Sequence, residues 1–260
     1  MNQAENITDL SYKTAVVIGG TSGLGRAIAL GLARSGANVI ATGRREELVS
    51  EVYAEIENAG RETLQKTVDV LQRESIDALR DAVLERFGRV DILINAAGRT
   101  AKNPTAVVPE SEWQAILDTN LNGTLRACQS FYEPLKKSGA GKIVNIASLA
   151  SYVAFHEVAA YGASKAAVLA LTKSLGCEWA RDGINVNALV PGVFPTKLNE
   201  KLLNGTERGR EILMRTPMKR FGRAEELVGA AIFLSSDSAS FITGQSIAVD
   251  GGYLASGVNS

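Results

Sequence analysis

Short apolar runs rich in β-branched residues alternate along the chain with longer segments in which apolar residues recur every three or four positions. Continuous apolar runs are typical of strands covered on both faces, as in a parallel sheet. The short runs lie at 14–18, 38–41, 67–68, 90–94, 142–146, 184–188 and 246–249. The longer segments, which have the periodicity of helices, lie at 25–34, 45–59, 73–87, 109–125, 158–180 and 224–234.

This alternation predicts an α/β fold of the Rossmann type, a doubly wound, seven-stranded parallel sheet flanked by helices. No Pro/Ser-rich linker and no shift in composition divides the 260 residues, so we expect residues 1–260 to form a single domain. Ligands bind beyond the carboxyl ends of the strands in such sheets. The residues that follow each strand are therefore the candidate site residues.

Composition narrows the range of partners. Lys plus Arg and Asp plus Glu both number 28, so the formal net charge is zero and nothing indicates a nucleic-acid or membrane-surface partner. The first ten residues are polar and lack the pattern of a signal peptide, and no apolar run has membrane-spanning length.

Cys128 and Cys177 are too few for a disulfide framework, and the single histidine, His156, has no neighbouring ligand set for a metal. We interpret the chain as a cytoplasmic protein with two buried, reduced thiols.

A glycine-rich turn follows the first predicted strand and leads into a predicted helix. Its glycines, Gly19, Gly23 and Gly25, allow a tight turn, let backbone amides approach a pyrophosphate and let the helix pack closely on the strand. Such a turn can also be no more than a turn. Its position between a strand and a helix favours a dinucleotide.

The residues at the end of the second predicted strand indicate which cofactor would bind. Gly43 stands where an acidic residue would bind the ribose hydroxyls of NAD, and Arg44 follows it. Because a guanidinium suits a 2′-phosphate, NADP(H) is the favoured cofactor and NAD(H) remains possible. In the alternative interpretation, Arg44 and Arg45 are solvated charges at the start of a helix.

Tyr161 and Lys165 stand four residues apart in a predicted helix and therefore share one of its faces. A neighbouring ammonium can lower the pKa of a phenol, which would let Tyr161 exchange protons near neutral pH. Alone, this pair would more often be an ordinary feature of an exposed helix face. Whether the pair is catalytic must therefore be judged from the other motifs of the chain.

Taken together, several motifs resemble those of the short-chain dehydrogenase/reductase family, in the expected order and over nearly the whole chain. They are the turn at 19–25, Asn95-Ala96-Ala97-Gly98, Asn120, Ser148, Tyr161 with Lys165, Pro191-Gly192 and the closing segment 242–252. The sequence departs from the family pattern at Ile18, where a threonine is usual, and at Ala96, where a second asparagine is usual.

The resemblance implies four catalytic roles. Tyr161 would exchange a proton with the substrate oxygen, while Lys165 would lower the pKa of Tyr161 and hold the nicotinamide ribose. Ser148 would hydrogen-bond the same substrate oxygen, and Asn120 would hold a water that links Lys165 to solvent. Structural alternatives stay open, because Ser148 could cap a helix, Asn120 could satisfy buried backbone groups and Asn95 could be a turn residue.

The resemblance also implies a set of cofactor contacts, among which Asp69 would lie near the adenine. The expected set is Gly19, Thr21, Ser22, Gly23, Leu24, Gly25, Arg44, Asp69, Val70, Asn95, Ala96, Gly98, Tyr161, Lys165, Pro191, Gly192, Val193 and Thr196.

The segment at about 193–220 is expected to form a mobile lid over the substrate, since long insertions after strands of this fold are commonly binding loops. Its excess of cations could attract a carboxylate, with Lys197 as the candidate contact, or could be a solvated helix face. His156 and Glu157 fall where the family places residues of the substrate wall, although a lone histidine in a loop is often only a loop residue.

The segments 216–222 and 251–257 are similar to the gluconate 5-dehydrogenase branch of the family and to neighbouring sugar-acid and polyol dehydrogenases. The leading hypothesis is an NADP(H)-dependent oxidoreductase that interconverts a secondary alcohol and a ketone on a sugar acid or polyol. The alternatives are a 3-oxoacyl-thioester (acyl-carrier-protein) reductase and, from another class, a non-catalytic nucleotide-sensing protein of the same fold. We expect a homotetramer, as relatives commonly form, with contacts through the helices near 111–131 and 158–180, including Ala166, Ala167, Val168 and Leu171.

Overall fold

The computed structural model describes residues 8–196 and 200–258, and its strands form one parallel sheet in the order β2-β1-β3-β4-β5-β6. The strand bounds are Thr14–Ile18 (β1), Asn38–Thr42 (β2), Ile92–Asn95 (β3), Gly141–Ile146 (β4), Ile184–Pro191 (β5) and Ser246–Val249 (β6). The chain runs outward from β1 to β2 and then crosses back to β3, so the strand order reverses between β1 and β3. This confirms the doubly wound fold and places its ligand-binding crevice at the carboxyl ends of these strands.

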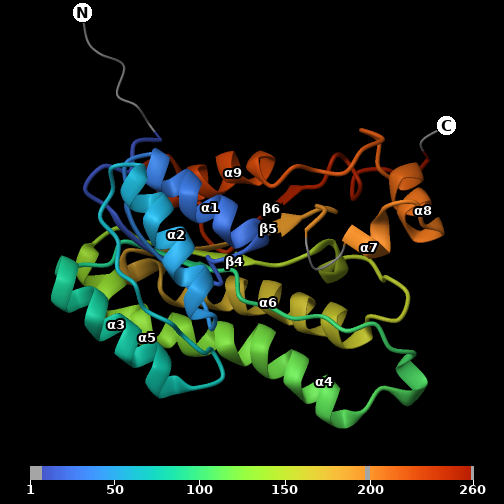
Figure 1. Ribbon diagram of the computed structural model, residues 1–260, viewed down its shortest axis with the longest axis horizontal. Helices are drawn as coiled ribbons and strands as arrows, with labels where there is room; N and C mark the ends of the chain where they lie inside the picture. Colours follow the sequence, from blue (N-terminus) through green and yellow to red (C-terminus); the bar gives the residue numbers. More distant parts are fainter. Residues whose placement is uncertain (1–7, 197–199, 259–260) are drawn as a thin grey trace, which may run out of the picture.

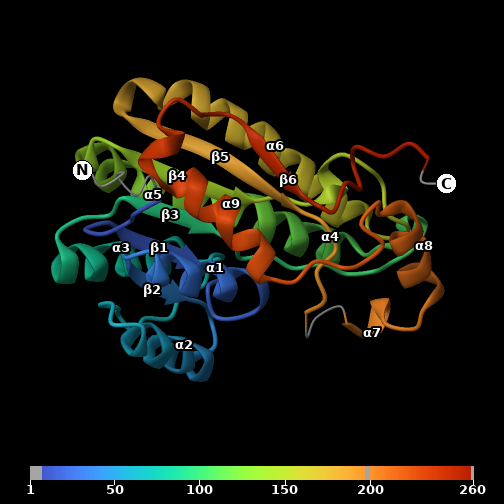
Figure 2. The ribbon, with the colours of Figure 1, turned by 90° about the horizontal axis from the view of Figure 1, so that it is seen from above.

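Helices cover both faces of the sheet (Figures 1 and 2). One group, α1, α2 and α9, packs on one apolar core, and the other, α3, α5 and α6, packs on a second core across the sheet. The bounds are Gly23–Arg34 (α1), Glu46–Asn58 (α2), Arg73–Phe87 (α3), Glu110–Leu117 (α4), Gly123–Ser138 (α5), Ala159–Glu178 (α6), Glu200–Leu203 (α7), Glu207–Arg215 (α8) and Glu225–Ser235 (α9). Two-sided coverage explains why the strands are continuous apolar runs rather than alternating ones.

The helix predicted at 109–125 is replaced by a longer structure. It begins with α4, passes through a π-helical stretch at Asp118–Asn122 and continues as α5 to Ser138. α5 contains Pro134, a residue that usually interrupts helices because it has no amide proton. Pro134 is buried, so its ring contributes to the core while the helix continues.

The predicted seventh strand at Thr67–Val68 is wrong. The amide of Val68 does donate to the carbonyl of Gly43, just beyond β2, at 3.0 Å. The carbonyl of Lys66, however, accepts a hydrogen bond from the side-chain hydroxyl of Thr42. With this carbonyl bound to a side chain, the segment runs beside β2 without a continuous backbone ladder, and the described sheet has six strands.

Two expectations from composition have different outcomes. Cys128 is buried under the sheet, but Cys177 is exposed on the outer face of α6, so the prediction of two buried thiols is wrong for Cys177. Within the described ranges, no helix combines the length and the apolar character that crossing a membrane requires.

Candidate active site

The turn between β1 and α1 packs so closely that its glycines leave no room for side chains. A Cβ atom on Gly25 would lie 2.1 Å from the carbonyl oxygen of Gly19, and one on Gly19 would lie 2.4 Å from the amide nitrogen of Ala97. Gly19 and Gly23 also have left-handed backbone angles, φ 83° and 53°. The side chain of Ser22 makes no capping hydrogen bond, which leaves the first amides of α1 open to an anion.

The carboxyl end of β2 reaches this turn at Gly43. A Cβ atom on Gly43 would lie 2.8 Å from Oγ1 of Thr21, so any larger residue at this position requires the Thr21 side chain to rotate. Arg44 is exposed, whereas Nη2 of Arg45 donates to Oγ of Ser22 at 3.5 Å. The structure therefore brings the guanidinium of Arg45 to the turn, a contact that the sequence analysis did not predict.

Asp69 and Val70 lie in the loop before α3, where other residues fix their positions. Oδ1 of Asp69 accepts the amide of Leu71 at 3.1 Å, and the carbonyl of Val70 accepts Nη1 of Arg126, from α5, at 3.2 Å. Leu24, in the first turn of α1, packs at the edge of the apolar core. The bond from Arg126 attaches the expected adenine side of the site to α5.

Asn95, at the end of β3, is buried and bonded within the protein. Its Nδ2 donates to Oδ1 of Asn145 at 2.9 Å and to Sγ of Cys128 at 3.3 Å. Within the described structure, no protein group bonds its Oδ1. The side chain of Asn95 thus connects the sheet to α5, while Ala96 and Gly98 follow it at the surface of the crevice.

Asn120 is fully buried in the π-helical stretch, a local helix type that is frequent at functional sites. Its Oδ1 accepts the amide of Arg99 at 2.8 Å, and its Nδ2 donates to the Arg99 carbonyl and to Oγ of Ser164, both at 2.9 Å. Oγ of Ser164 in turn donates to the carbonyl of Tyr161 at 2.7 Å. Asn120 therefore satisfies buried backbone groups, as its structural alternative predicted, and also connects to α6 beside Tyr161.

Lys165 and Tyr161 lie on the buried side of the first turns of α6. Nζ of Lys165 donates to the carbonyl of Ile146, the last residue of β4, at 2.6 Å, and it lies 5.9 Å from the centroid of the Tyr161 ring. A Cβ atom on Gly98 would lie 3.6 Å from this Nζ and 3.4 Å from Oδ1 of Asn120. The π-helical stretch and the start of α6 thus bring Asn120, Tyr161 and Lys165 together beside Gly98, which follows β3.

Ser148 has two contacts. Its Oγ accepts the amide of Ala150 at 3.2 Å and so caps the short 3-10 helix at Leu149–Ser151, as the structural alternative predicted. Ser148 also lies near enough to the Tyr161 side chain to oppose the rise in the pKa of its phenol. The cap fixes the position from which Ser148 reaches the phenol.

Burial controls the protonation of the lysine and tyrosine. It raises the pKa of the Tyr161 phenol above its ordinary value, and the hydrogen bond with Ser148 opposes this rise. It lowers the pKa of Lys165 from 10.5 to about 8. The ammonium of Lys165 donates to the Ile146 carbonyl, and its predicted effect on the phenol pKa stays a prediction.

Glu157 lies just before α6 with a left-handed backbone, φ 63°. Its carboxylate pairs with Nζ of Lys102 at 3.0 Å and lies 3.5 Å from Nδ1 of His156, and its carbonyl accepts the amide of Asn103 at 2.8 Å. The ion pair with Lys102 is the main cause that holds the pKa of Glu157 below its usual value. His156 is exposed. These contacts attach the loop after β3 to the segment that precedes α6.

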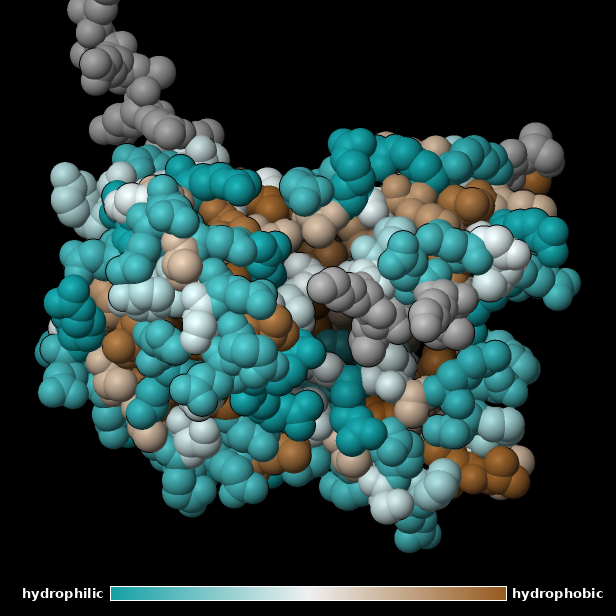
Figure 3. All heavy atoms as spheres, viewed as in Figure 1, coloured by the Kyte–Doolittle hydropathy of each residue, from teal (hydrophilic) through white to brown (hydrophobic). Residues whose placement is uncertain are grey.

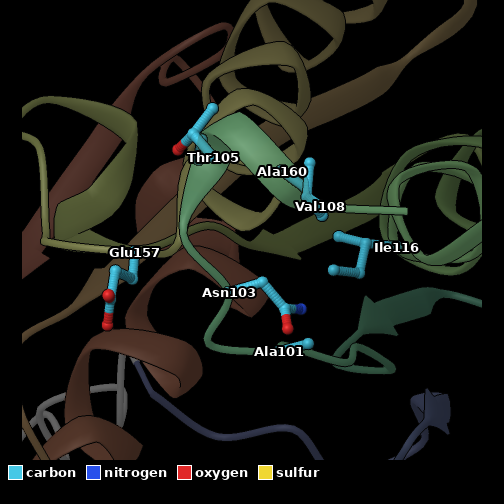
Figure 4. A pocket seen from close by; sticks show the side chains of 8 residues that line it. Ala101, Asn103, Thr105, Val108, Ile116, Glu157 and Ala160 are labelled. Carbon is cyan, nitrogen blue, oxygen red and sulfur yellow. The ribbon is translucent and has the colours of Figure 1, made fainter. Parts of the chain in front are cut away.

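A cavity of about 10 Å³, enough for one water molecule, lies beside these residues (Figure 4). Side chains of the loop after β3, of α4 and of the start of α6 surround it: Ala101, Asn103, Thr105, Val108, Ile116, Glu157, Ala159 and Ala160.

The chain that leaves β5 crosses the end of the sheet. Pro191 is buried, and the amide of Gly192 donates to the carbonyl of Val249 in β6 at 2.8 Å. The carbonyl of Val193 accepts the amide of Gly222 at 3.0 Å, which joins the two ends of the long insertion.

The insertion then reaches the glycine-rich turn. A Cβ atom on Gly23 would lie 3.5 Å from Cγ2 of Thr196, so Thr196 lies directly beside the start of α1. Lys197, the expected contact for a carboxylate, lies outside the described residues. The surface is hollowed between the side formed by α1 and α2 and the side formed by α7 and α8 (Figure 3).

Two arginines of α8 contact a pair of aromatic rings near the hollow. The rings of Phe155 and Tyr253 stack with centroids 6.0 Å apart. The guanidinium of Arg208 lies 6.0 Å from the Phe155 centroid, and that of Arg215 lies 4.8 Å from the Tyr253 centroid. Nη1 of Arg208 also donates to the carbonyl of His156 at 3.4 Å. These contacts hold α8 on the segment that leads into α6.

Sequence reasoning missed some residues that fix this site. Ser164 and Ile146 supply the hydrogen bonds that connect Asn120 and Lys165 to α6 and β4. Ser164 directly precedes Lys165 and could have been suspected from its place on the same helix turn. The carbonyl of Ile146 could not, because a backbone acceptor leaves no mark in the sequence.

Comparison with known proteins places the chain among oxidoreductases. A family model described as enoyl-(acyl carrier protein) reductase matches residues 19–254. The 2-dehydro-3-deoxy-D-gluconate 5-dehydrogenase of Bacillus subtilis is 39% identical over 98% of this chain and 99% of its own length. The NAD-dependent glycerol dehydrogenase of Listeria innocua is 40% identical over 95% of each chain. The crystal structure of a gluconate 5-dehydrogenase from Burkholderia cenocepacia, in complex with NADP and tartrate, is 35% identical, with a TM-score of 0.93 over 96% of this chain and 98% of that one.

The buried Lys165 gives a prediction for stability. Its pKa of about 8 in the folded protein, against 10.5 ordinarily, means that charging it when folded costs about 3 kcal/mol below pH 8. Lys165→Met removes this cost, but it also removes the hydrogen bond to Ile146, which is worth about 1 kcal/mol. The substitution should therefore raise the free energy of unfolding at pH 7 by roughly 1–2 kcal/mol.

The advantage of Lys165→Met in free energy of unfolding should shrink between pH 8 and 10.5. In that range the unfolded wild type binds more protons than the folded wild type, so the wild type becomes more stable as the pH rises. Urea unfolding at pH 7 and at pH 10 measures this. Lys173→Met, at an exposed lysine of the same helix, is the control and should change little at either pH. Destabilisation by Lys165→Met that does not depend on pH would contradict the assignment.

Proposed function

The chain belongs to the short-chain dehydrogenase/reductase family, and from that premise we propose that it is an NADP(H)-dependent oxidoreductase that interconverts a secondary alcohol and a ketone on a sugar acid or polyol. The observation that carries the proposal is the convergence of Ser148, Tyr161, Lys165 and Asn120 at the carboxyl ends of β3 and β4, beside the glycine-rich turn. The substrate class is supported by the relatives, whose names include a sugar-acid and a polyol dehydrogenase.

The residues fit a dinucleotide. At Gly19 and Gly25 a Cβ atom would collide with backbone, so the turn presents backbone amides where a pyrophosphate can approach. Thr21, Ser22, Gly23 and Leu24 complete the turn. Asp69, Val70, Ala96 and Gly98 would line the adenine and ribose side, and Pro191, Gly192, Val193 and Thr196 the nicotinamide side. The bound cofactor supplies or accepts the hydride.

The chain's own residues would move the proton. Because burial raises the pKa of Tyr161, its phenol is protonated at neutral pH and can donate to a ketone oxygen. Ser148 would hydrogen-bond the same oxygen, and Lys165 would hold the ribose. In the direction of alcohol oxidation Tyr161 must accept a proton, so oxidation is expected to accelerate as the pH rises.

Two features favour NADP(H) over NAD(H). Position 43 is a glycine where an acidic residue would favour NAD, and two arginines follow it. Arg45 reaches the turn through Ser22, and exposed Arg44 is available to a 2′-phosphate. A solved relative binds NADP, whereas another relative is NAD-dependent by name, so the preference needs a direct test.

We propose that residues 1–260 act as one catalytic domain and that 193–220 form its substrate lid. The contacts of Arg208 and Arg215 with Phe155 and Tyr253 support this role, since they join α8 to the segment that leads to Tyr161. We place His156 and Glu157 on the substrate wall, and we retain Lys197 as the candidate partner for a substrate carboxylate. A cytoplasmic location is proposed from the two free thiols.

Proton transfer by Tyr161 gives a prediction that also tests the reaction. In a spectrophotometric assay with gluconate, glycerol and an acetoacetyl thioester, the wild type should turn over the sugar acid or the polyol. Tyr161→Phe should lower kcat by roughly 10²- to 10⁴-fold with little change in cofactor affinity, because it removes the proton donor and keeps the ring.

Tyr152→Phe is the matched control, since its hydroxyl bonds Ser246 at 2.6 Å outside the proposed machinery. Turnover of the thioester alone would favour the 3-oxoacyl-thioester reductase. Tight cofactor binding without turnover of any substrate would favour a nucleotide-sensing protein.

Cofactor choice depends on Arg44 in this proposal. A charge-assisted contact with the 2′-phosphate is worth roughly 1.5–3 kcal/mol, so Arg44→Ala should weaken NADPH about tenfold or more and leave NADH nearly unchanged. Fluorescence titration with both cofactors measures this. Arg45→Ala shows whether the second arginine shares the contact, and Arg181→Ala, at an exposed arginine in the turn after α6, is the control. Equal losses of NADPH and NADH affinity in both test variants would exclude a selective role.

We propose a homotetramer in which the outer face of α6 contacts a partner. The exposed residues Ala163, Ala166 and Ala170 form a face of small side chains that allows a close symmetric approach. Val168, expected at this contact, is 1% exposed and belongs to the core instead. Light scattering should give about four times the chain mass, and Ala166→Arg should reduce it. A monomeric mass for the wild type at micromolar concentration would contradict the proposal.

A further inference from the structure

Two asparagines form a buried amide pair in the middle of the sheet. Asn95 in β3 and Asn145 in β4 are register partners, and their side chains are joined by the bond from Nδ2 of Asn95 to Oδ1 of Asn145 at 2.9 Å. Asn95 is 4% exposed and Asn145 is fully buried. Such polar groups in an apolar layer are retained only where their hydrogen bonds matter.

Each amide also bonds to a helix of the same layer. Nδ2 of Asn145 donates to Oγ1 of Thr172, on α6, at 3.0 Å, and Oγ1 of Thr172 donates on to the carbonyl of Val168 at 2.8 Å. Nδ2 of Asn95 reaches Sγ of Cys128, on α5, at 3.3 Å. The amide pair therefore connects both central strands to α5 and to α6, the helix that carries Tyr161 and Lys165.

These contacts lie about two helical turns from the proposed catalytic residues. Thr172 follows Lys165 by seven positions, which places both on the buried side of α6. The strand residues that they bind, Asn145 and Ile146, are consecutive in β4. α6 is thus attached to β4 at two points, one at Thr172 and one at Lys165.

Hydrogen bonds are directional and can therefore fix the position of α6 along β4 more sharply than apolar contacts alone. The other residues on this side of α6, such as Val168, Leu169 and Leu175, make contacts that are not directional. Displacing α6 by one residue would turn its side chains by about 100° and move them by about 1.5 Å. Asn145 and Thr172 would then both be left buried without their partner.

We propose that Asn145 and Thr172 are positioning residues, whose hydrogen bond fixes the register of α6 on β4 and so holds the Lys165 ammonium against the carbonyl of Ile146. The inference rests on the proposed function for its effect on turnover, because Lys165 is a proposed catalytic residue. Its structural part, the position of the ammonium, can be measured without a substrate.

The test compares three variants. Thr172→Val removes the hydroxyl while keeping the shape, and Thr172→Ser keeps the hydroxyl and should restore wild-type behaviour. Leu175→Ala, one turn further along the same buried side, destabilises the core without touching the hydrogen bond. If Thr172→Val does not fold, Thr172→Ala removes the same hydroxyl without adding a methyl group at its position.

The first measurement is an NMR titration of lysine labelled with ¹³C at Cε, with the Lys165 resonance identified by its absence from Lys165→Met. In the wild type and in Leu175→Ala, Lys165 should titrate near its pKa of about 8. In Thr172→Val it should titrate closer to 10.5, because a displaced ammonium regains water. An unchanged Lys165 titration in Thr172→Val would overturn the inference, whatever happens to its melting temperature.

The second measurement is kcat on whichever substrate the wild type turns over. Misplacing a catalytic group by about 1 Å costs up to about 100-fold, so Thr172→Val should lose roughly 10- to 100-fold in kcat, and Thr172→Ser much less. Equal kcat losses in Thr172→Val and Leu175→Ala, at matched stability, would overturn the positioning role. If the wild type turns over no substrate, the proposed function fails, and the titration still decides the register.

Discussion

The structure of the site depends on one buried cation. The ammonium of Lys165 is buried at the end of β4, where it donates a hydrogen bond to the carbonyl of Ile146 over an N···O distance of 2.6 Å. Burying a charge is costly unless its bonds are satisfied, so the protein must hold α6 and β4 in a fixed relation to keep this group in place. Tyr161 and Ser148 then take positions that follow from that relation. The phenol and the lysine both have pKa values shifted toward the neutral form by the same burial.

The part of the site that would hold the cofactor is formed mainly by backbone groups and less by side chains. The amides of Gly19 and Gly20 both donate to the carbonyl of Thr42, and the amide of Ala96 donates to the carbonyl of Ile18. These bonds bring the ends of β1, β2 and β3 to one turn in which glycine is the only residue that fits. A surface made of backbone amides binds phosphates through geometry and partial charge.

The proposed substrate side is built differently, from ion pairs and cation–aromatic contacts between loops. Lys102 with Glu157, and Arg208 with Phe155, join segments that lie more than 50 residues apart in the chain. Such exposed contacts are weak individually and can exchange partners. If these contacts form the substrate wall as proposed, related proteins can differ in substrate while the proposed proton-transfer residues stay the same. The relatives of this chain include dehydrogenases named for different substrates.

The sequence by itself determined the layered α/β fold, the glycine-rich turn and the pairing of Tyr161 with Lys165. Each follows from local rules: apolar runs, glycine spacing and the four-residue repeat of a helix. Only the tertiary structure decided that Thr67–Val68 is not a strand, that Lys165 binds a backbone carbonyl and that Arg45 reaches the turn. These outcomes depend on which distant atoms meet, and a backbone acceptor has no residue identity to read. The amide pair of Asn95 and Asn145 is the clearest case, since two asparagines 50 residues apart become partners only through the register of β3 on β4.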